Sequence, residues 1–117
     1  MQSVSSNAVA QTVNGLYNLP TGDLPLDANV TMSVAHILFQ SGRSNPSFLS
    51  HYPSITNFNS AGGGCAYTLV TISANDTTAR VSQFCTINYY NTSGSWVYKV
   101  YTRRKVDVTW FGWQAIL

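Results

Sequence analysis

The stretch ARVSQFCTINYYNTSGSWVYKVYT, residues 79–102, decides the fold class of this chain. Side chains alternate in character along each of its halves, and a period of two residues is that of a β-strand. Between the halves lies Asn91-Thr92-Ser93-Gly94, a composition typical of a hairpin turn. We therefore predict two antiparallel strands, residues 79–90 and 95–102. One face of the first strand carries Val81, Gln83, Cys85, Ile87 and Tyr89.

Further strands are predicted where β-branched and aromatic residues gather. They are residues 29–40, 65–73 and 106–113, with a short strand at 54–61. Breaks between strands are predicted at residues 41–50, at the three glycines 62–64, at the turn 74–77 and at the charged triplet 103–105. Strands at this spacing favour an antiparallel meander or sandwich.

The N-terminal segment holds the clearest helical pattern. Ser5 or Ser6 is suited to cap a helix over residues 5–14, and Pro20 prevents its continuation. A single apolar stripe on this helix consists of Val9, Val13 and Leu16. The stripe fits either docking on the chain's own core or a seam that joins identical chains. We place the helical segment at residues 1–18 and a β-rich domain at 19–117.

Composition excludes several classes of protein. The chain has 117 residues, which suits one domain, and only 9% of them are charged, with no Glu. A hydrophobic content of 44% excludes intrinsic disorder, and a net charge of +2 argues against a nucleic-acid partner. Apolar runs are too short for a membrane-spanning helix.

The residues that carry most site chemistry are few and scattered. Cys65 and Cys85 fit no zinc spacing; we favour two small buried side chains, with one disulfide as the alternative. His36 lies in an apolar stretch and His51 follows a Ser-rich loop, so neither has a partner for nucleophilic catalysis. The four Asp residues form no carboxylate pair of the glycosidase type. We expect no enzyme activity, no cofactor and no metal.

Aromatic residues, 13% of the chain, are the remaining functional signal. Tyrosine joins an apolar ring to a polar tip, which suits contact with sugars or protein surfaces. The tyrosines expected to be exposed and to bind ligand are Tyr89, Tyr90 and Tyr101. Packing in the core or in an interface is the expectation for Trp96, Trp110 and Trp113.

Two parts of the chain resemble a known family. Residues 3–10, SVSSNAVA, resemble the S-x-x-V-x-S-N-A-V-A helix of bacteriophage tail-fibre and baseplate appendage proteins. Residues 65–117 resemble the pyocin-knob-like domain found at phage fibre ends. The matching segments are Tyr67-Thr-Leu-Val-Thr-Ile, Arg80-Val-Ser-Gln-Phe, Val97-Tyr-Lys-Val-Tyr-Thr-Arg and Thr109-Trp-Phe-Gly-Trp-Gln-Ala-Ile.

The resemblance implies an intertwined homotrimer of mainly β knobs, with Val9, Val13 and Leu16 forming the seam. It implies a virion appendage, made in the bacterial cytoplasm and joined to other fibre or baseplate proteins, that attaches to a host surface glycan or protein. It also implies that Trp110 and Trp113 anchor the knob. Residues 26–59 depart from the family pattern, so the receptor surface is expected there. The alternatives are a purely structural capping knob or head-fibre module and, last, a polysaccharide depolymerase.

Overall fold

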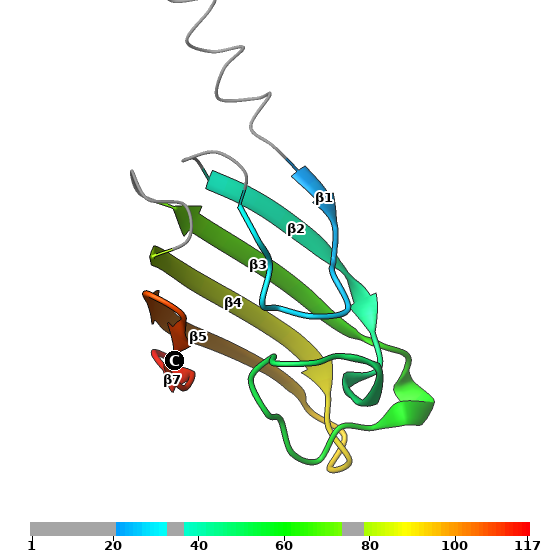
Figure 1. The fold of residues 1–117 in the computed structure, drawn as a ribbon. Helices are drawn as coiled ribbons and strands as arrows, with labels where there is room; N and C mark the ends of the chain where they lie inside the picture. The colour runs from blue at the N-terminus through cyan, green and yellow to red at the C-terminus, as the bar shows by residue number, and fades with distance from the viewer. Residues whose placement is uncertain (1–20, 33–36, 74–78) are drawn as a thin grey trace, which may run out of the picture.

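A computed structural model describes residues 21–32, 37–73 and 79–117 of the chain. These residues form one seven-stranded sheet in the order β1-β2-β3-β4-β5-β6, with β7 also paired to β5 (Figure 1). β1 and β2 run parallel, and every other neighbouring pair is antiparallel. The strands are β1 (Thr21–Asp23), β2 (Ile37–Ser44), β3 (Cys65–Ser73), β4 (Arg80–Tyr90), β5 (Trp96–Val106), β6 (Thr109–Trp110) and β7 (Gln114–Ala115).

The central hairpin confirms the strand prediction for residues 79–102. β4 pairs with β5 over eleven residue pairs, from Arg80 opposite Val106 to Tyr90 opposite Trp96. Asn91 shapes the turn, because its Oδ1 accepts hydrogen bonds from the backbone N–H groups of Ser93 (3.0 Å) and Ser95 (2.9 Å). β3 also has the predicted bounds. The mainly β class is therefore confirmed.

The charged triplet 103–105 does not form the predicted turn. These residues lie inside β5, because β4 supplies hydrogen-bond partners along the whole length of the strand. The chain turns instead at Asp107 and Val108, where Asp107 has a positive φ of 55°. Pairing with a neighbouring strand has overridden the local preference of a charged run.

The first half of the chain differs more from the prediction. β2 begins at Ile37 and ends at Ser44, so the strand predicted at residues 29–40 is largely displaced toward the C-terminus. Residues 46–48 and 60–62 form short 3-10 helices. The strand predicted at 54–61 is reduced to one isolated bridge between Phe58 and Asn91. The predicted helix, the seam of Val9, Val13 and Leu16, the turn at 74–77 and His36 lie outside the described residues.

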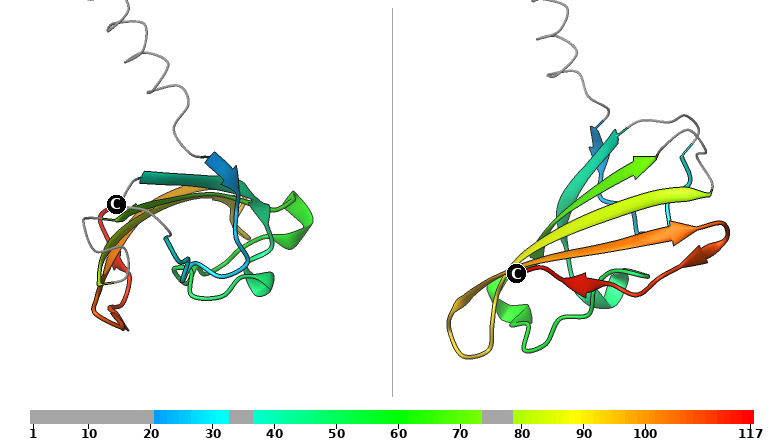
Figure 2. Two further views of the ribbon diagram at one scale, coloured as in Figure 1. Left: turned by 45° about the horizontal axis from the view of Figure 1, so that its top comes forward. Right: turned by 90° about the vertical axis from the view of Figure 1, so that its left-hand side faces the viewer.

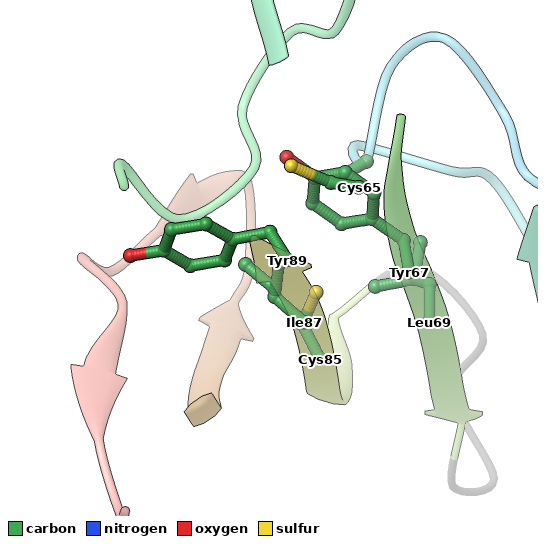
Figure 3. Close-up of a cluster of buried hydrophobic side chains, with 7 residues drawn as sticks. Cys65, Tyr67, Leu69, Cys85, Ile87 and Tyr89 are labelled. Carbon is green, nitrogen blue, oxygen red and sulfur yellow. The ribbon is translucent and has the colours of Figure 1, made fainter. Parts of the chain in front are cut away.

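The sheet is curved, and loops cover one of its faces (Figure 2). We call this the covered face; the opposite one is the open face. Along β3 and β4, alternate residues are buried against the loops while their neighbours point outward. In the described part of the chain, β2 to β6 pair in sequence order within one sheet, as the predicted meander requires. Loops lie where the predicted sandwich would have a second sheet. The buried cluster consists of Ala28, Cys65, Tyr67, Leu69, Cys85, Ile87 and Tyr89 (Figure 3).

Both cysteines are free and buried in this cluster. The sheet register places Cys85 opposite Leu69, four residues from Cys65 along β3. Burial raises the pKa of Cys65 to about 11 and that of Cys85 to about 12. The interpretation of the two cysteines as small buried side chains is confirmed.

Candidate functional site

A buried polar network ties the covered face to its loops. Arg103 is only 6% exposed, and its Nε donates to Gln83 Oε1 at 2.7 Å. Its Nη2 donates to Asn29 Oδ1 at 2.8 Å. Gln83 Nε2 in turn donates to the Ala28 carbonyl at 2.7 Å and to Thr71 Oγ1 at 3.0 Å. The polar groups of this network therefore satisfy one another, as burial requires.

Two of the three tryptophans complete this network. The guanidinium carbon of Arg103 lies 4.0 Å from the ring centroid of Trp110 and 4.5 Å from that of Trp113. Trp113 Nε1 donates to the His51 carbonyl at 2.8 Å. Burial lowers the pKa of Arg103 to about 10, an effect that the nearby Asp27 charge opposes, so the guanidinium stays charged at neutral pH. We interpret the network as a structural clamp.

The exposed side chains of His51 and Asp27 form a hydrogen bond, with 2.8 Å between Nδ1 and Oδ1. The Asn29 backbone N–H, chiefly, lowers the pKa of Asp27; slight burial opposes this, and His51 adds to it. In the described part of the chain, neither side chain is hydrogen-bonded to a hydroxyl or a thiol that could act as a nucleophile. The pair therefore has no catalytic constellation around it.

The three tyrosines predicted to bind ligand lie in different environments. Tyr89 is 4% exposed, and its hydroxyl donates to the Thr56 carbonyl at 3.1 Å, so its expected exposure is wrong. The reason is alternation: Tyr89 shares the covered face with Cys85 and Ile87. Tyr101, opposite Cys85, lies half-buried on the same face. Only Tyr90 lies on the open face, where it is half-buried.

The open face carries an aromatic platform, consisting of Tyr90, Trp96 and Tyr98. Trp96 is 71% exposed, so it lies outside the chain's own core, and Tyr98 is 49% exposed. The rings of Tyr90 and Trp96 meet edge to face, with 5.2 Å between their centroids. Asn88, directly opposite Tyr98, adds an exposed amide beside them. Sequence alternation had separated the faces correctly but carried no sign of which face the loops would cover.

Within residues 21–32, 37–73 and 79–117, no group of three His, Cys, Asp or Glu side chains is placed to hold a metal ion. The same ranges contain no helix that is long and apolar enough to cross a membrane.

Comparison with known proteins gives no relative from which a role could be carried over. No protein-family model matches the chain, and neither a curated protein nor a solved structure matches it. The functional argument therefore depends on the surfaces described above.

Proposed function

We propose that this chain is a non-enzymatic binding module, a trimeric phage fibre end that attaches to a glycan or protein on a bacterial surface. The observation that carries the proposal is the aromatic platform of Tyr90, Trp96 and Tyr98 on the open face of the sheet. The resemblance of residues 3–10 and 65–117 to phage fibre segments supports the virion setting.

The platform has the chemistry of a recognition surface. An exposed Trp ring presents a large apolar face to solvent, and burying it against a ligand is favourable. The contact of Trp96 with Tyr90 restricts its ring before a ligand arrives, which reduces the entropy lost on binding. The amide of Asn88 and the hydroxyl of Tyr98 lie beside the ring and offer hydrogen bonds to hydroxyl-rich ligands.

A trimer would give three such platforms on one particle. Linked weak sites gain affinity through effective concentration without any new contact. The low charge of the chain agrees with this proposal, since a neutral surface of Asn, Ser, Thr and Tyr suits weak binding at repeated sites.

The test is binding of the fluorescently labelled chain to a panel of bacterial cells and arrayed bacterial glycans. We expect Trp96→Ala to weaken binding about tenfold, which corresponds to about 1.4 kcal/mol. Val108→Ala is the control, because Val108 is an apolar residue, 90% exposed, in the turn that follows Val106, at the opposite end of β5 from Trp96. It should bind like the unmodified chain.

Three outcomes would contradict the proposal. Equal binding by the Trp96 variant and the unmodified chain would remove the platform from recognition. Absence of binding to every cell and glycan would favour the structural capping knob. Release of reducing sugar from a bound polysaccharide would favour the depolymerase.

A further inference from the structure

A second feature of the open face is a pocket of about 310 Å³, toward the end of the face away from the platform. β4, β5 and the C-terminal edge of the sheet build it together. Its volume is at the lower end of the range for small-molecule sites. Its side-chain lining includes Ser82, Phe84, Thr102, Arg104, Phe111 and Gln114.

The pocket combines apolar walls with two arginines. The guanidinium of Arg103 is already engaged by Gln83 and Asn29, so Arg104 is the cation of interest. Phe84 and Phe111 are both exposed aromatic side chains. The guanidinium carbon of Arg104 lies 4.8 Å from the Phe111 ring centroid, so the ring orients the cation. Ser82 lies directly opposite Arg104 on β4 and adds a hydroxyl.

Arg104 is available to an anion from outside the chain. Among the described residues, no carboxylate lies within ion-pair distance of it. The nearest cation on the same face, Arg80, is engaged by Asp107 at 3.3 Å. The pocket lining itself contains no acidic residue. An exposed guanidinium that no described carboxylate engages is well suited to a planar carboxylate, which it binds through two parallel hydrogen bonds.

We propose that this pocket binds the carboxylate-bearing sugar of an acidic bacterial polysaccharide, with Arg104 on the carboxylate and the Phe84 and Phe111 rings against the sugar. The inference rests on the proposed function and names the ligand class. Phe84 and Tyr90 are six residues apart on one strand, about 20 Å at the usual rise of a β-strand. One polysaccharide chain lying along the open face can therefore reach both the pocket and the platform.

The experiment titrates the isotope-labelled full chain with D-glucuronate, D-glucose and acetate, and follows amide shifts by NMR. Glucuronate differs from glucose only by its carboxylate, and acetate supplies the carboxylate without the sugar. We expect a Kd for glucuronate of about 1 mM, with shifts at Ser82, Arg104 and Phe111, and binding of glucose and acetate at least fivefold weaker.

Two variants locate the cation responsible. Arg104→Gln removes the charge but keeps much of the stem, and we expect it to weaken glucuronate binding at least fivefold. Arg43→Gln is the matched control: Arg43 is an exposed arginine on β2, two strands from β4. It removes one positive charge from the same chain and should change affinity less than twofold.

Several results would overturn the inference: no glucuronate binding, equal affinity for glucose, equal affinity for acetate, or unchanged affinity in Arg104→Gln. Equal affinity for acetate would leave only a simple anion site. Trp96→Ala separates this inference from the proposed function, because it should weaken binding to cells and arrayed glycans about tenfold and leave glucuronate affinity within twofold. Normal cell binding by the Trp96 variant would count against the proposed function alone.

Discussion

Arg103 is a buried cation that, among the described residues, no carboxylate contacts directly. Two side-chain carbonyl oxygens and two indole rings take the place of a counter-ion. Such an arrangement depends on the planar fork of the guanidinium, which a lysine cannot reproduce.

We expect Arg103→Lys to lower the free energy of unfolding by about 2–4 kcal/mol, because charge-assisted hydrogen bonds and cation–π contacts are lost together. Urea unfolding followed by tryptophan fluorescence measures the change. The neighbouring Arg104 is exposed, so Arg104→Lys should change the free energy of unfolding by less than about 0.5 kcal/mol. Equal effects of the two substitutions would show that the network contributes little.

The buried thiols make the free energy of unfolding depend on pH in the alkaline range. Their folded pKa values, about 11 for Cys65 and about 12 for Cys85, lie above the unfolded value of about 8.5. Between these limits the unfolded chain loses protons that the folded chain keeps, so stability is complete below about pH 8.5 and falls as pH rises. The expected loss of stability from pH 9 to 10 is about 1.2 kcal/mol per thiol.

Urea midpoints at several pH values between 8 and 10 measure this slope. The Cys85→Ala variant should show a smaller slope than the unmodified chain. Cys65, Tyr67 and the half-buried Tyr52, whose pKa values burial also raises, account for the slope that remains. A slope that the substitution leaves unchanged would contradict the assignment to the thiols.

At the scale of elements, the turn of the β4–β5 hairpin depends on Gly94, whose φ is 85°. We expect Gly94→Ala to cost about 1–2 kcal/mol, because an L side chain is strained in this region of backbone conformation. Its Cβ would also lie 3.4 Å from the Tyr90 hydroxyl oxygen. Thermal unfolding measures the loss. Gly112→Ala is the control, since a Cβ there has nothing within 4 Å; a similar loss in both variants would contradict the argument.

The strands from Cys65 to Thr102 could be predicted because their pairing is local. Alternation fixes the faces, and the turn at Asn91–Gly94 fixes the register of β4 against β5. Residues 103–105 show the limit of local rules, because pairing with residues 81–83 of β4 keeps the triplet in a strand. The covering loops could not be predicted, since contacts such as that of Arg103 with Asn29 join distant parts of the sequence.

The candidate site, too, has features that local sequence predicts and features that depend on distant contacts. Alternation placed Trp96 and Tyr98 on one face, but which face the loops cover depends on the fold as a whole. For this reason the predicted exposure of Tyr89 is wrong. Trp96 lies outside the chain's own core, and its packing in an interface stays a prediction. The pocket around Arg104 forms only because the C-terminal segment lies beside β5. No local sequence pattern predicts this pairing.

At the scale of the whole molecule, oligomeric state is the expectation to measure first. Light scattering should give about 38.4 kDa, three times the chain mass of 12.8 kDa. We expect Val13→Asp to dissociate the trimer, because it places charge in the apolar seam, while Gln11→Asp, off the stripe, should not. A monomeric mass for the unmodified chain would contradict the proposed trimer.

The clamp on the covered face joins residues near the C-terminal end of the sequence to loops in its first half. Arg103 bonds Asn29 across 74 residues, and Trp113 bonds His51 across 62. During synthesis on a ribosome these loops emerge before Arg103 and Trp113, so the covered face cannot close until residues 103–113 have been made. A messenger truncated before the codon for Arg103 would therefore yield a chain whose apolar sheet face is open to chaperones and proteases.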